Sequence, residues 1–106
     1  WFKASIEYEN EIYQRLGSVV TNNGYSDWAT TDINAGINEM YYRLSRKGAD
    51  FCLENSTDGL NFNQMRIFHL FEAGDEINIG IYACSPSESS FEAIFTELRM
   101  FDSVWK

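Results

Sequence analysis

Three acidic residues alternate near the start of the chain: Glu7, Glu9 and Glu11. Side chains two positions apart in an extended strand project from the same face, so this spacing predicts three carboxylates side by side. Two carboxylates about 5 Å apart can serve as nucleophile and acid in glycoside hydrolysis, which makes Glu7 and Glu9 the candidate catalytic residues of an enzyme. The alternative is a solvated acidic surface, because Glu9 and Glu11 lie where the strand pattern runs into a turn.

A second set of side chains suits ligand binding without catalysis. Sugars are commonly held by an aromatic ring that stacks on the sugar and by charged or amide groups that hydrogen-bond its hydroxyls. Trp28 is the predicted anchor of such a site. The other candidate ligand-binding residues are Tyr25, Arg43, Glu54, Glu7 and Tyr82. Structural alternatives remain open, since Trp28 and Tyr25 can hold a hairpin in register and Arg43 with Glu54 can form a cross-strand ion pair.

The remaining reactive residue types are predicted to be structural. His69 is the single histidine, so a multi-histidine metal site or a second catalytic base is not available, and we expect no metal and no cofactor. Cys52 and Cys84 are predicted to be free and buried, because two cysteines do not make the dense disulfide framework of a small secreted protein. Asp58, in a Ser-Thr-Asp-Gly turn, is predicted to bond loop amides.

Short alternating runs separated by turn residues position these side chains, a pattern typical of an antiparallel all-β domain. About eight strands are predicted, within residues 1–9, 14–21, 25–30, 39–46, 51–55, 62–70, 76–84 and 91–101. Asn22-Asn23-Gly24 is predicted to close a hairpin, since these residues tolerate positive φ. The run 76–84 has the cleanest alternation, whereas 91–101 also fits a short helix and is assigned to a strand on its β-favouring residues.

Composition limits the possible functions. One domain, residues 1–106, fits the length, and eight Phe, six Tyr and three Trp predict an aromatic core. The net charge of −8 argues against nucleic acid and anionic membranes as partners. No apolar run approaches the roughly 20 residues that cross a bilayer, and neither a signal peptide nor a transit peptide is recognisable. We therefore expect a cytoplasmic protein.

The chain opens at Trp1, inside a strand pattern, which predicts that further strands complete the sheets. Several segments resemble domain-of-unknown-function family 1349, a bacterial and fungal family that includes the yeast regulation of enolase protein. They include residues 1–8, Tyr25-Ser26-Asp27-Trp28, 42–48, 56–59 and 80–86. The resemblance implies a concanavalin A-like sandwich, or jelly roll, of which this chain is the C-terminal part. The missing N-terminal strands would come from the same chain, a second copy or another subunit.

The resemblance implies a fold more than an activity, because the family has no established function. Concanavalin A-like folds include lectins and glucanases, and the acidic strand at Glu7 and Glu9 is similar to a glucanase motif, except that glucanases usually carry Asp at the middle position. The sequence thus favours a non-catalytic module that binds carbohydrate or another small polar ligand. The alternatives are a glycoside hydrolase-like enzyme and an intracellular regulatory or scaffolding protein that binds another protein.

Overall fold

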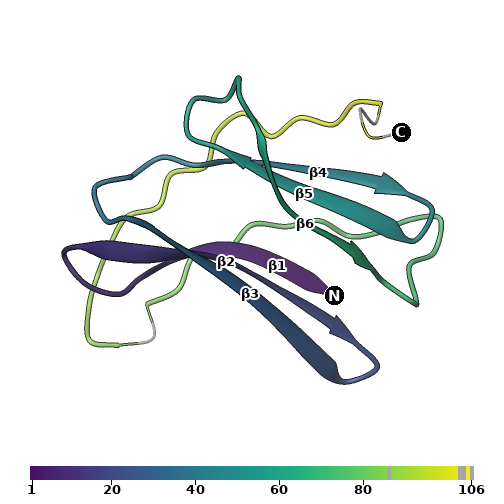
Figure 1. The fold of residues 1–106 in the computed structure, drawn as a ribbon, viewed down its shortest axis with the longest axis horizontal. Coiled ribbons are helices and arrows are strands. Elements are labelled where there is room, and N and C mark those ends of the chain that lie inside the picture. Colours follow the sequence, from purple (N-terminus) through teal and green to yellow (C-terminus); the bar gives the residue numbers. More distant parts are fainter. Residues whose placement is uncertain (86, 103–104, 106) are drawn as a thin grey trace.

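The computed structural model describes residues 1–85, 87–102 and 105, which contain two antiparallel sheets and no helix (Figure 1). Sheet A consists of β1 (Phe2–Tyr8), β2 (Tyr13–Asn22) and β3 (Tyr25–Asn34). Sheet B consists of β4 (Tyr41–Lys47), β5 (Asp50–Ser56) and β6 (Asn63–His69). Strands pair in chain order within each sheet. No described segment forms a helix that could cross a membrane.

The turn at Asn23-Gly24 sets the register of sheet A. Asn23 and Gly24 have φ values of 52° and 80°, a conformation that Asn and Gly adopt with little strain. The turn places Asn22 opposite Tyr25, which then aligns Val19 with Trp28 and Gly17 with Thr30. The predicted hairpin is thereby confirmed.

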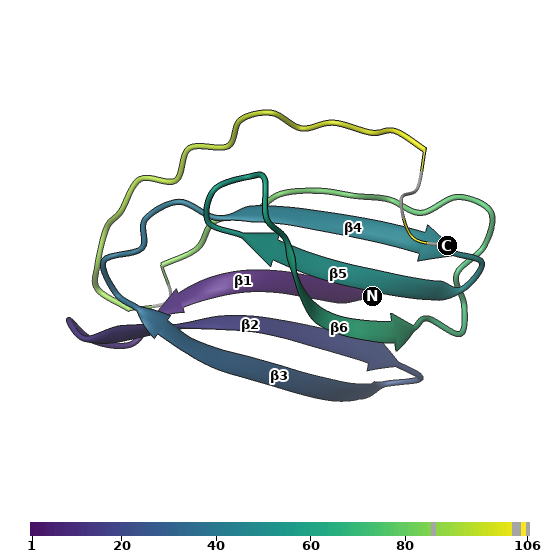
Figure 2. The same ribbon diagram turned by 45° about the horizontal axis from the view of Figure 1, so that its top comes forward.

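Aromatic and aliphatic side chains between the two sheets form the core. Phe51 is completely buried, and its ring stacks on Phe68 with centroids 5.4 Å apart. Phe2 of sheet A contacts the same pair, with its centroid 4.7 Å from that of Phe68. Val20 and Leu53 complete the buried cluster. Figure 2 shows β4 of sheet B at the top and β3 of sheet A at the bottom, with the other strands between them.

The number of strands differs from the prediction: the residues that the structure describes form six strands, not about eight. The runs 76–84 and 91–101 are neither strands nor helices, and Ile79 and Ile81 are each 61% exposed. Alternation makes a segment suitable for a sheet, but a strand also needs the backbone of a neighbour. Among the described residues, no backbone hydrogen bond joins 76–84 to β1 or β4.

Other expectations are corrected or confirmed residue by residue. β3 continues to Asn34, past the predicted end at residue 30, because its long hairpin with β2 stays paired as far as Tyr13. In the described part of the chain each sheet follows the chain order, so two opposed sheets are confirmed and the jelly roll stays a prediction. Both cysteines are free, as predicted, but only Cys52 is buried. Cys84 is exposed because the run that carries it is not covered by a sheet.

The turn after β5 is held by one carboxylate. Oδ1 of Asp58 accepts hydrogen bonds from the backbone N–H groups of Leu60 and Asn61, each 2.8 Å long, and from the Ser56 hydroxyl. These bonds stabilise the ionised form and hold the pKa of Asp58 well below its ordinary value of 3.8. The predicted structural role of this motif is confirmed.

Truncation of the core should lower stability strongly. We expect Phe51→Ala to reduce the free energy of unfolding by about 3–5 kcal/mol, because it removes a fully buried ring and leaves a cavity. Leu60→Ala, at an exposed position, is the control and should change stability by less than about 0.5 kcal/mol. Urea unfolding followed by circular dichroism measures both variants. Equal effects would contradict the assignment of the core.

Charge at Asp58 should stabilise the protein only where the carboxylate is ionised. A lowered folded-state pKa gives stability that is present above the ordinary value of 3.8 and is lost as the pH falls below it. We therefore expect Asp58→Asn to be less stable than the parent at pH 7 and to converge with it as the pH falls below 3.8. Urea midpoints across this pH range provide the test, and a pH-independent difference would refute the charge effect.

Candidate functional site

The outer face of sheet A contains a hollow. Since Phe2 and Ala4 face the core, the alternation of β1 directs Lys3, Ser5 and Glu7 outward. Pairing then produces three outward cross-strand rows: Lys3–Val19–Trp28, Ser5–Gly17–Thr30 and Glu7–Arg15–Asp32. The central row is low because Gly17 has no side chain. The result is a hollow of about 220 Å³, here called the outer hollow, whose lining includes Lys3, Glu7, Arg15, Gly17, Trp28 and Thr30.

Trp28 forms an aromatic wall of the outer hollow. Its side chain lies on β3, one of the two edge strands of sheet A, and the residue is 74% exposed. An indole ring left in water gives up much of the free energy that its burial would supply. Trp28 is thus available for contact with a ligand, and packing within its own hairpin leaves most of its surface open.

Lys3 and Arg15, which line the outer hollow, each pair with a glutamate. Lys3 Nζ lies 3.6 Å from Glu7 Oε1, and the Ser5 hydroxyl donates to the same oxygen at 3.2 Å. Arg15 lies 3.4 Å from Glu9, and this carboxylate is the main cause of a raised Arg15 pKa. These pairs are solvent-exposed and therefore weak, so a ligand can replace them at low cost.

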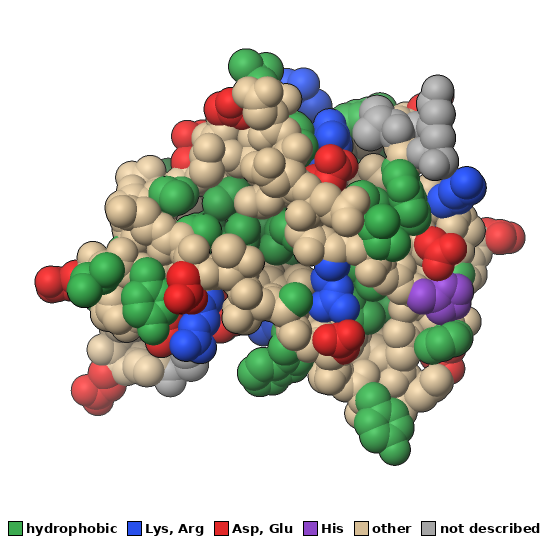
Figure 3. Space-filling model, viewed as in Figure 1, with side chains coloured by type: hydrophobic (Ala, Val, Ile, Leu, Met, Phe, Trp, Pro, Cys, Tyr) green, Lys and Arg blue, Asp and Glu red, His purple; other side chains and the backbone are tan. Residues whose placement is uncertain are grey.

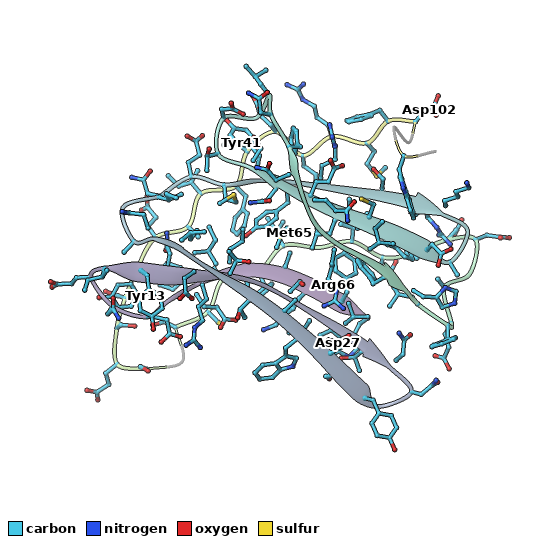
Figure 4. The ribbon with its side chains drawn as sticks, viewed as in Figure 1. Tyr13, Asp27, Tyr41, Met65, Arg66 and Asp102 are labelled. Atoms are coloured by element: carbon cyan, nitrogen blue, oxygen red, sulfur yellow. The ribbon has the colours of Figure 1, made fainter. Side chains whose placement is uncertain are left out.

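The second hollow, of about 560 Å³, lies between β3 and β6, and its lining includes Tyr25, Asp27, Arg66, His69 and Phe71. Figure 4 shows Arg66 of β6 close to Asp27 of β3. The Arg66 guanidinium donates to Asp27 Oδ2 at 3.2 Å. His69 Nδ1 lies 2.7 Å from Asp50 Oδ1, a pairing that agrees with the structural role predicted for this histidine. Both basic side chains of this lining are thus engaged by acids.

The predicted ligand-binding residues lie in four different places. Glu7 and Trp28 line the outer hollow, and Tyr25 lines the hollow between β3 and β6. Arg43 and Glu54 pair across β4 and β5 in a two-bond contact of 3.0 and 2.9 Å. The Arg43 guanidinium also covers the Phe62 ring at 4.1 Å, so this pair is largely occupied by the protein itself.

Tyr82 lies apart from these groups, beside both β1 and β4. Its ring centroid is 6.0 Å from Lys3 Nζ. On the β4 side it neighbours Tyr42, whose pKa is raised to about 12, mainly by burial of the phenol and secondarily by Tyr82. Tyr82 therefore lies near one edge strand of each sheet, β1 and β4. Its neighbour Lys3 also lines the outer hollow.

Sequence reasoning identifies neither Gly17 nor the pairing of Asp27 with Arg66. Gly17 becomes recognisable once the Asn23-Gly24 turn fixes which residues share a row. The Asp27–Arg66 contact joins residues on different sheets, and no local pattern signals it. Glu7 lines the outer hollow and pairs with Lys3, whereas Glu9 pairs with Arg15 and is not part of the lining, and their catalytic role stays a prediction.

Comparison with known proteins supports a family assignment. No curated protein and no solved structure matches the chain. A family model matches residues 1–102, nearly the whole chain, and confirms the family that the sequence resembles. The chain therefore belongs to the family described as protein of unknown function, DUF1349.

Proposed function

We propose that the protein is a non-catalytic module that binds carbohydrate or another small polar ligand in the outer hollow. The observation that carries the proposal is the exposed Trp28 ring beside a floor that lacks a side chain at Gly17. An aromatic ring next to an open floor suits a flat ligand with an apolar face. Lys3 and Glu7 flank the same space with a donor and an acceptor.

Each wall of the hollow has a distinct part in this proposal. The Trp28 ring packs against the C–H face of a sugar, where apolar area is removed from water. Glu7 accepts hydrogen bonds from hydroxyls, while Lys3 and Arg15 donate to ring or hydroxyl oxygens. These side chains give up only weak surface ion pairs when they turn to the ligand.

The size of the outer hollow limits the ligand. Sites for drug-sized molecules usually measure about 300–1,000 Å³, whereas this hollow measures about 220 Å³. It therefore suits one ring-sized unit, with any further units of a longer ligand lying in solvent. Modest affinity is expected, because a shallow site removes only part of the ligand surface from water.

We also propose, from the sequence, that the protein has a concanavalin A-like fold and that it is cytoplasmic. The family resemblance supports a concanavalin A-like arrangement, and the presence of two opposed antiparallel sheets agrees with it at the level of a β-sandwich. Cysteine usage supports a cytoplasmic location.

Trp28→Ala should abolish most of the binding. A panel of glucose, galactose, mannose and N-acetylglucosamine, free and as oligomers, is titrated into the protein by calorimetry. We expect Trp28→Ala to weaken binding of the best sugar at least about tenfold, or 1.4 kcal/mol. Tyr25→Ala is the matched control, since it removes an exposed ring from the same strand but from the other hollow. Equal losses in both variants, or no binding by the parent protein, would contradict the proposal.

Filling the floor should block the ligand and preserve the fold. A Cβ at Gly17 would meet Thr30 Cγ2 at 3.4 Å, an ordinary contact, and valine suits a strand. We expect Gly17→Val to retain the urea midpoint of the parent or exceed it while losing sugar binding. Calorimetry and urea unfolding of the same preparation make the comparison. A variant that still binds with parental affinity would place the ligand elsewhere.

A further inference from the structure

The outer hollow extends along the sheet as far as Trp1. The backbone of Trp1 continues the pairing of β1 with β2, since its N donates to the Thr21 carbonyl at 3.1 Å and its own carbonyl accepts from the Thr21 N–H at 2.8 Å. Alternation then places the Trp1 side chain on the outward face, together with that of Lys3. Thr21 lies opposite Ser26, so Trp1, Thr21 and Ser26 form a fourth outward row at the hairpin end of sheet A.

The four rows make the hollow long and shallow. Its lining begins at Trp1 in the first row and ends at Glu7 and Arg15 in the last. Side chains of rows that lie six residues apart along a strand are separated by roughly 20 Å, and the strands on either side of β2 are about 10 Å apart. A volume of about 220 Å³ over this length makes the outer hollow a shallow trough that follows β2.

Two exposed tryptophans flank this trough from opposite sides. Trp28 on β3 is 74% exposed, and Trp1 at the start of β1 is 64% exposed. The open floor at Gly17 lies one row beyond Trp28 and two rows from Trp1. Two rows correspond to roughly 14 Å along the strands. A single sugar ring on this floor, beside Trp28, therefore leaves the Trp1 ring free for another unit.

The side chains along the trough suit a neutral chain of hydroxyl-bearing rings. A peptide strand adds to a sheet at its edge, through main-chain hydrogen bonds, whereas this hollow lies on a face and offers side chains. Its charges occur in pairs of opposite sign, Lys3 with Glu7 and Arg15 with Glu9. Figure 3 shows a similar mixture of acidic and basic side chains on the face that it draws. Such a surface does not favour a highly charged ligand, but hydroxyls can use both its donors and its acceptors.

We propose that the ligand of the outer hollow is an unbranched oligosaccharide that lies along β2, with one unit at Trp28 and Gly17 and a further unit on Trp1. This inference rests on the proposed function, because it assigns the ligand class of the same site. The unit on Trp1 contacts the protein on one side and solvent on the other. Each ring that is covered removes apolar area from water, so affinity rises with the number of units until the trough is filled.

Calorimetric titration with sugars of increasing length tests the proposal. The ligands are glucose, galactose, mannose and N-acetylglucosamine, each compared with its own linear oligomers. Affinity of the parent protein should rise with length and level off once the extended oligomer reaches roughly 20 Å. Trp1→Ala should weaken binding of the best oligomer at least about fivefold and leave binding of its monosaccharide unchanged. Tyr8→Ala is the matched control, since it removes an exposed ring from the opposite face of the same strand, and it should bind every sugar as the parent does.

Nuclear magnetic resonance of the parent protein gives an independent measurement, because each tryptophan has one indole N–H signal. The Trp28 signal should shift with monosaccharide and oligomer, and the Trp1 signal with the oligomer alone. Affinity that does not depend on length, or a Trp1 signal that no oligomer shifts, would overturn this inference and leave the single-ring site in place. Equal losses in Trp1→Ala and Tyr8→Ala would also overturn it. Absence of binding at every length would instead reject the proposed function, and this inference with it.

Discussion

Contact among the rings of Phe2, Phe51 and Phe68 joins the two sheets, and the rest of the structure depends on it. A three-stranded sheet has too little buried area to be stable unless one of its faces is covered. Once Phe2 faces sheet B, the strict alternation of β1 directs Lys3 and Glu7 to the opposite face. The polar surface of sheet A is therefore a geometric consequence of where the core lies.

The pairing register of β2 and β3 determines which of their side chains face the core and which line the outer hollow. Val20 points into the core, and Val19 beside it points outward, opposite Trp28. A slip of one residue in this pairing would transfer the indole to the inner side of the sheet. The position of the proposed ligand site is thus determined at the Asn23-Gly24 turn, some distance from any side chain that would touch a ligand.

Local sequence patterns predicted much of the fold. The features that depend on contacts between distant residues could not be predicted from these patterns. Alternation and turn residues identified the six strands, and the motif at Asp58 identified its turn, because each depends on neighbours in the sequence. The run 76–84 alternates equally well, yet no strand forms there, since pairing requires a neighbour that the run itself does not encode. Trp28 and Glu7 line one hollow on sheet A, whereas Arg43 and Glu54 lie on sheet B. Alternation alone could not show that these two pairs belong to different sheets.

The meander order of the strands has a consequence for how the chain folds. Every strand pair joins neighbours in the sequence, so each sheet can assemble by closing short hairpins with little loss of loop entropy. Contacts between the sheets, such as that of Phe2 with Phe68, require a much longer loop to close. Sheets A and B are therefore expected to form early as separate units, with their docking as the slow step that creates the native core.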